Sequence, residues 1–247
     1  MNIKQYLDST YLKTAINAGI SESENTKIAE SFIQEAIDEQ FKLIMIRPEI
    51  VHMAKKMITE ARSKVVIGTV IDFPEGKSAI EAKLIEAVQA IADGADELDF
   101  VCNYEAFKSG NVALLKEEIL KGTQLGLENH KVVKWIIEVA ALNTQQIVQL
   151  SALIKNVAVS NFKEEVYDQV FVKSSTGFYK TDNNAPNGAT VETIVMMLEN
   201  ASPLPVKAAG GVRTYEEAVA MVRLGVKRIG TSSAKAIASG QISDSNY

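Results

Sequence analysis

The chain has 247 residues, which is enough for one large domain or two small ones. Charged residues make up 23% and hydrophobic residues 47%, and the net charge of −5 argues against nucleic-acid and membrane-surface partners, so an anionic ligand would need a local pocket. A single cysteine excludes an intrachain disulfide. The sequence shows no signal peptide and no apolar run of the about 18–20 residues needed to span a membrane. These observations together predict a cytoplasmic location.

Eight short apolar segments, rich in Val, Ile and Phe, have the pattern of strands in a buried parallel sheet. In chain order they are Ile3–Asp8 (the weakest), Lys42–Ile46, Val65–Ile71, Glu97–Val101, Val132–Glu138, Gln169–Lys173, Pro205–Ala208 and Lys227–Gly230. Helical periodicity is expected between them, at Ser78–Ala92, Thr144–Ile154, Thr190–Leu198 and Thr214–Leu224. Ser78 with Glu81 and Thr214 with Glu217 have the spacing of capping boxes, and Gly94 has the position of a helix stop.

Strands that alternate with helices eight times in about 250 residues predict a single (β/α)8 TIM barrel over residues 1–247, with a short N-terminal segment. A doubly wound open sheet is the structural alternative. The polar end of the chain, QISDSNY, predicts a flexible tail from about residue 240.

Two lysines lie at the ends of predicted strands, Lys173 in VFVK and Lys207 in PVKAAGG. Burial and a neighbouring positive charge lower the pKa of an amine from about 10.4 toward roughly 7–8, and a neutral amine can attack a carbonyl to form an imine. Asp99, inside ELDFV, is the natural carboxylate to relay protons. The alternative is that each lysine reaches solvent or pairs with a carboxylate.

Glycine- and hydroxyl-rich loops follow the last three predicted strands: KSSTGF, AAGGVRT and GTSSA. The loops after strands 7 and 8 are the frequent phosphate site of a (β/α)8 barrel. The expected contacts are Gly210, Gly211, Gly230, Ser232 and Ser233, with Arg213 as a possible charge. The alternative is that these glycines only serve tight turns.

The motifs VKSSTGF, KAAGGVRT and RIGTSSA, with LDSTYLK and GADELDFVCN before them, resemble the deoxyribose-phosphate aldolase family from about residue 7 to residue 237. The resemblance implies a class I aldolase on a (β/α)8 barrel. Such an enzyme reversibly cleaves the small phosphorylated sugar 2-deoxy-D-ribose 5-phosphate to D-glyceraldehyde 3-phosphate and acetaldehyde through a lysine Schiff base. It also implies no cofactor, and with only two histidines, His52 and His130, we expect no zinc site built from histidines.

Carried over by position, the resemblance implies that Lys173 forms the Schiff base, that Lys207 tunes it and relays protons, and that Asp99 is the proton-relay aspartate. Substrate and phosphate binding fall by the same resemblance on a further set of residues: Asp8, Thr10, Gly177, Gly210, Gly211, Ser232 and Ser233.

The chain departs from the family pattern at Met45, Asp72 and Val139, and it inserts YKTDNNAP after TGF. Asp72 places a negative charge near the barrel mouth, where it would weaken phosphate binding or pair with Arg47 or Lys134. None of these departures touches the two lysines or Asp99.

Other interpretations stay open at the level of sequence. A non-catalytic phosphate-binding barrel and another phosphosugar barrel enzyme, such as an isomerase, are the alternatives to an aldolase. Barrels commonly pair, which makes a homodimer possible, but no interface signature is visible. The terminal Tyr247 is either the end of a mobile tail or a phenol that folds back and passes a proton to the carbon beside the imine.

Overall fold

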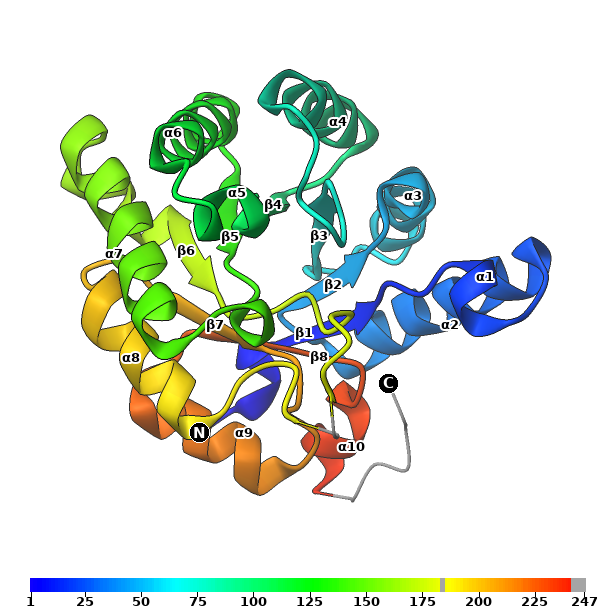
Figure 1. The fold of residues 1–247 in the computed structure, drawn as a ribbon. Coiled ribbons are helices and arrows are strands. Elements are labelled where there is room, and N and C mark those ends of the chain that lie inside the picture. The colour runs from blue at the N-terminus through cyan, green and yellow to red at the C-terminus, as the bar shows by residue number, and fades with distance from the viewer. Residues whose placement is uncertain (183–184, 241–247) are drawn as a thin grey trace.

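The computed structural model describes residues 1–182 and 185–240, whose strands form a closed parallel barrel in chain order (Figure 1). β8 pairs with β1 through Leu7 opposite Ile229 and Asp8 opposite Gly230, which closes the ring. The expected (β/α)8 barrel is therefore confirmed, and the open-sheet alternative is wrong. The strands are β1 Leu7–Tyr11, β2 Leu43–Ile46, β3 Val66–Ile71, β4 Glu97–Val101, β5 Val132–Ile136, β6 Val170–Lys173, β7 Val206–Ala209 and β8 Arg228–Thr231.

Helices surround the ring of strands (Figure 1). The α-helices are α1 Ala15–Ala18, α2 Glu22–Glu39, α3 Val51–Glu60, α4 Ile80–Asp93, α5 Tyr104–Lys108, α6 Val112–Glu128, α7 Thr144–Asn161, α8 Val191–Ala201, α9 Tyr215–Leu224 and α10 Ala234–Ser239. Short 3-10 helices lie at η1 Ile3–Tyr6, η2 Pro48–Ile50, η3 Val139–Ala141 and η4 Glu164–Gln169. Within the described ranges, none of these helices has the length and apolar character needed to cross a bilayer.

Successive side chains along a strand point to opposite faces, and this alternation separates an apolar layer beneath the helices from a charged layer in the barrel interior. In β4, Leu98 and Phe100 are buried in the apolar layer beneath the helices. Asp99, which lies between them, contacts lysines of β5, β6 and β7 across the barrel interior. The fold thus places the polar residues of ELDFV on the face that holds the candidate site.

Two local expectations are wrong. The first strand begins at Leu7 rather than Ile3, because Ile3–Tyr6 forms the 3-10 helix η1. No capping box forms at Ser78, whose hydroxyl instead donates to Asp72 while α4 begins two residues later. The capping box of Thr214 with Glu217 is present, as expected, and Gly94 ends α4 in the left-handed conformation.

Candidate active site

A buried carboxylate at the centre of the barrel joins the two lysines predicted from the sequence. The Nζ atoms of Lys173 and Lys207 each lie 2.9 Å from the same oxygen, Oδ2 of Asp99. Lys173 and Lys207 are paired neighbours in the β6–β7 ladder, and this register places both side chains at one level of the barrel. Only Lys173 retains a little exposure, 3%, against none for the other two groups.

The charged layer extends beneath these residues. Lys134 of β5 lies 2.7 Å from Asp99 Oδ1 and 2.5 Å from Glu97. On the other side Lys207 lies 2.7 Å from Asp8, and Arg228 bridges Asp8 and Glu97. The cluster holds four basic and three acidic groups, so full ionisation would leave one positive charge in excess in a buried place. Loss of one lysine proton balances the cluster.

Lys173 is the group best placed to lose that proton. Burial lowers its pKa from 10.5 to about 8, with Lys207 and Lys134 adding to the decrease and Asp99 opposing it. Burial raises the pKa of Asp99, but Lys134, Lys173 and Lys207 outweigh it and hold that pKa well below the usual range. Burial also lowers the pKa of Lys134, yet Asp99 and Glu97 raise it overall. The arrangement offers an amine that is partly neutral near pH 8 beside an ionised carboxylate.

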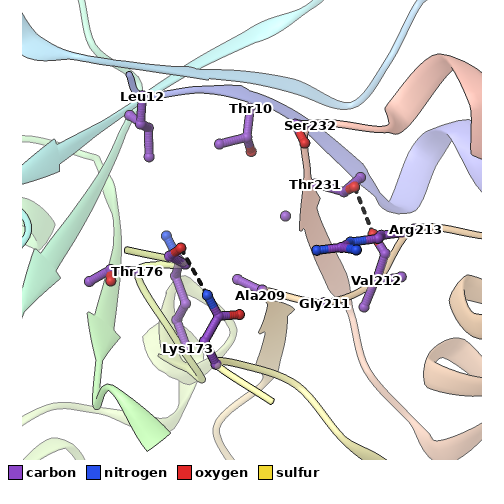
Figure 2. A pocket seen from close by; sticks show the side chains of 14 residues that line it. Thr10, Leu12, Lys173, Thr176, Ala209, Gly211, Val212, Arg213, Thr231 and Ser232 are labelled. Carbon is purple, nitrogen blue, oxygen red and sulfur yellow. Dashed lines mark hydrogen bonds between the residues drawn. The ribbon is translucent and has the colours of Figure 1, made fainter. Parts of the chain in front are cut away.

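A pocket opens above Lys173 at the carboxyl ends of the strands (Figure 2). Figure 2 shows Lys173 and Thr176 on one side, Thr10 and Leu12 on another, and Arg213 and Ser232 on a third, around one open space. Backbone of Gly177, Gly210, Gly211 and Gly230 completes the wall, together with Asn187 and neighbours in the same loops. Arg213 is the second cationic side chain among the described residues that line it.

Most of the predicted binding residues meet in this pocket, but two do not line it. Asp8 lies below, fully buried between Lys207 and Arg228. Ser233 is buried at the start of α10, where its N–H donates to Thr231. In the loop after β7, Gly210 and Gly211 have φ angles of 78° and 90°, which residues with a side chain rarely adopt. This turn therefore requires glycine whether or not it binds phosphate.

The comparisons with known proteins agree with this geometry. The model of the DeoC/LacD family of aldolases matches residues 11–243. The chain belongs to this family. Deoxyribose-phosphate aldolase of Thermococcus gammatolerans is 36% identical over 97% of this chain and 96% of its own length. The enzyme of the same name from Streptococcus pneumoniae strain Hungary19A-6 is 35% identical over the whole of both chains.

Solved structures show the same barrel. The aldolase QR15 superposes with a TM-score of 0.80 at 31% identity, covering 97% of this chain and 95% of that chain. A deoxyribose-phosphate aldolase from Aeropyrum pernix, described as tetrameric, gives a TM-score of 0.76 at 26% identity, with 96% and 89% covered. The resemblance drawn from the motifs is thus confirmed, and an aldolase is favoured over an isomerase or a non-catalytic barrel.

Several residues of this aldolase site escaped the sequence interpretation. Glu97, Lys134 and Arg228 complete the charged layer, and a signal for them was present, because each is a charged residue inside an otherwise apolar strand. Glu97 also precedes Asp99 by two, so both point to the same face. Nothing in the sequence marked Asn187 as a site residue, because it follows the aperiodic insertion YKTDNNAP. The structure shows that it lines the pocket.

The departures from the family pattern lie outside the charged layer. Asp72 forms its ion pair with Lys83, at 3.4 Å, whereas Lys134, one of the partners expected for it, is held by Asp99 and Glu97. Met45 packs with Leu12 in an apolar cluster inside the barrel. Val139 is buried in the main core. Tyr247 and the tail expected to be flexible fall at residues 241–247, outside the described residues.

Proposed function

We propose that this aldolase cleaves 2-deoxy-D-ribose 5-phosphate to D-glyceraldehyde 3-phosphate and acetaldehyde, and forms it in reverse, with Lys173 as the Schiff-base lysine. The observation that carries the proposal is the single oxygen of Asp99 that Lys173 and Lys207 share at 2.9 Å each. An amine of lowered pKa, a buried carboxylate and a second ammonium are the groups that imine chemistry needs. Two relatives named deoxyribose-phosphate aldolase, which cover 97% and 100% of this chain, support the same substrate.

The chemistry follows from these groups. The neutral Lys173 amine attacks C1 of the open-chain aldehyde, and water leaves to give a protonated imine. Removal of the C3 hydroxyl proton breaks the C2–C3 bond, whose electron pair moves toward the imine and leaves an enamine. D-glyceraldehyde 3-phosphate departs, C2 takes up a proton, and water releases acetaldehyde. Asp99 and Lys207 carry protons in these steps, because their contact with Lys173 forms a continuous hydrogen-bonded path.

The phosphate end of the substrate has a separate place. Gly210, Gly211 and Ser232 lie on the β7 and β8 side of the pocket, with Arg213 beside them. Backbone N–H groups of glycine-rich turns and a guanidinium are suitable donors for a phosphate. Binding energy from this remote group holds C1 near Lys173 without taking part in the bond changes.

Borohydride trapping tests the proposal. Incubation with acetaldehyde and borohydride is expected to add an ethyl group to the protein, and peptide mapping by mass spectrometry is expected to place it on Lys173. The same protein should release D-glyceraldehyde 3-phosphate from 2-deoxy-D-ribose 5-phosphate. A label on Lys207 would reverse the roles of the two lysines, and absence of any adduct would exclude the imine mechanism.

A further inference from the structure

A buried carboxyl group next to the pocket has no part in the proposed chemistry. Glu138 follows β5 by two residues and is only 1% exposed. Its φ of 54° is in the left-handed region, which is uncommon for a residue other than glycine. A conformation of this kind persists only where the surrounding contacts fix it, so the contacts of Glu138 indicate what it does.

All described hydrogen-bond partners of the Glu138 carboxyl group lie in the turn that follows Lys173. Oε1 of Glu138 lies 2.8 Å from the hydroxyl of Ser175. Oε2 accepts from the N–H of Thr176 at 3.2 Å and from the Thr176 hydroxyl. Thr176 lines the pocket beside Lys173. Glu138 therefore ties the end of β5 to the first residues after the candidate nucleophile.

The contact continues through Ser175 to the far side of the insertion. The Ser175 hydroxyl lies 2.6 Å from the carbonyl oxygen of Asn187 and accepts from the N–H of Gly177 at 2.9 Å. Ser175 has one hydroxyl proton, which it can share between the Glu138 carboxyl and the carbonyl oxygen of Asn187. Burial raises the pKa of Glu138, while the hydrogen bonds from Thr176 and Ser175 oppose that rise. The Ser175 hydroxyl therefore joins the carboxyl of Glu138 to the backbone of Asn187.

From Asn187 the contacts reach the phosphate side of the pocket. Gly188 packs so closely on Gly210 that a Cβ atom at 188 would overlap its backbone. The N–H of Ala189 lies 2.8 Å from the carbonyl oxygen of Gly210 and 3.2 Å from that of Ala209. Residues 187–189 therefore pack directly against the loop after β7, and Ser175 is one of the groups that hold Asn187 in place, beside the carbonyl oxygen of Gly177.

We propose that Glu138 is a positioning residue, which holds the turn after β6 and, through Ser175 and Asn187, the glycine loop that takes the substrate phosphate. The inference rests on the proposed function, because it assigns the β7 loop to that phosphate. The Glu138 carboxyl makes no described hydrogen bond to Lys173 or Asp99, and Lys173 acts on it only as a nearby charge. Its direct contacts are with the turn after β6, so its main effect is expected on phosphate binding.

Loss of this connection is expected to act mainly on KM for the phosphorylated sugar. Glu138→Leu and Ser175→Ala should each raise that KM about tenfold. This is the loss expected when one charge-assisted hydrogen bond from the loop after β7 to the substrate phosphate is weakened. Both variants should trap acetaldehyde on Lys173 at the wild-type rate and keep the wild-type kcat/KM for unphosphorylated 2-deoxyribose. Glu138→Gln, whose amide can donate to Ser175 and accept from Thr176, should restore a KM near that of the wild type.

The controls separate this proposal from its alternatives. Glu105→Leu changes an exposed glutamate that pairs with Lys108 and should leave all constants unchanged. If Glu138→Leu does not fold, Ser175→Ala decides the question. An unchanged KM in Ser175→Ala, equal losses for both sugars, or a Gln variant as impaired as the Leu variant would overturn the role of Glu138. Failure of the wild-type protein to cleave 2-deoxy-D-ribose 5-phosphate would instead remove the proposed function.

Discussion

At the scale of single residues, the site depends on an imbalance of charge. Three lysines and an arginine meet three carboxylates in a buried place. Buried charges are tolerated when they are balanced by opposite charges, so the cluster, which has one positive charge in excess, favours the loss of one lysine proton. Lys173 is closest to the pocket and is the one with a markedly lowered pKa. The lowered pKa of Lys173 is therefore a consequence of burial first, and then of several surrounding charges rather than of one neighbour.

The pH dependence of imine formation follows from this pKa. The amine of Lys173 is the reactive form, and its fraction rises about tenfold per pH unit until the pKa, about 8, and then levels off. Initial rates of acetaldehyde trapping by borohydride, measured from about pH 6 to 10, should follow that curve. A rate that keeps climbing toward the ordinary lysine pKa would contradict the lowered value.

Lys134 offers a test of the charge balance itself. Its charge adds to the lowering of the pKa of Lys173, and it also neutralises one oxygen of Asp99. Replacement by methionine removes the repulsion and leaves Asp99 freer to hold Lys173 as an ammonium. The midpoint of the trapping curve in Lys134→Met should therefore move to higher pH. Exposed Lys116 on α6 supplies the control as Lys116→Met, and a midpoint that moves down or not at all would refute the coupling.

Lys207 is expected to matter for turnover more than for folding. Lys207→Leu removes a fully buried ammonium that joins Asp8 to Asp99, and with it the proton path to Lys173. We expect kcat/KM for 2-deoxy-D-ribose 5-phosphate to fall by about a thousandfold or more, with far-ultraviolet circular dichroism retained. Activity within about tenfold of the wild type would show that Lys207 does not relay protons.

At the scale of elements, the strands were predictable and the connections less so. Seven of the strands lie within one or two residues of the expected ranges, because buried parallel strands are continuous apolar runs. The start of the first strand was placed too early, because Ile3–Tyr6 forms a 3-10 helix and the strand begins at Leu7. Lys173, Lys207 and Asp99 could be found as charged residues on such runs. Asn187 lines the pocket but follows an aperiodic insertion, so no local pattern in the sequence predicts its position.

Helix α6 gives an element-scale prediction. Gly122 and Gly126, one turn apart, face β5, and a Cβ atom at these positions would overlap the side chains of Trp135 and Val133. Gly→Ala within a helix normally stabilises it, but here the helix would have to move away from the barrel. Gly126→Ala should lower the free energy of unfolding by about 1–3 kcal/mol in urea denaturation. Gln124→Ala, on the exposed face of the same helix, should change it little.

At the scale of the whole molecule, the barrel separates two tasks by strand number. In the proposed mechanism, proton transfer and imine formation fall to the side chains of β4, β6 and β7 in the interior, and anion binding falls to the loops that follow β7 and β8. The closed ring fixes the relative positions of the strand ends from which both groups of residues arise. Binding energy gained at the rim is thereby available to orient the reacting carbon near Lys173.

This separation predicts how the enzyme treats a substrate without its phosphate. Unphosphorylated 2-deoxyribose should have a kcat/KM lower by about a hundredfold or more, because the rim donors lose their partner while the lysines keep their chemistry. Inorganic phosphate should compete with the phosphorylated sugar for the rim, yet leave the rate of acetaldehyde trapping on Lys173 unchanged. Arg213→Gln should weaken that inhibition, since Arg213 brings a guanidinium to the same wall. Equal kcat/KM for the two sugars, or phosphate that slows trapping as much as cleavage, would show that the anion site and the imine site are not separate.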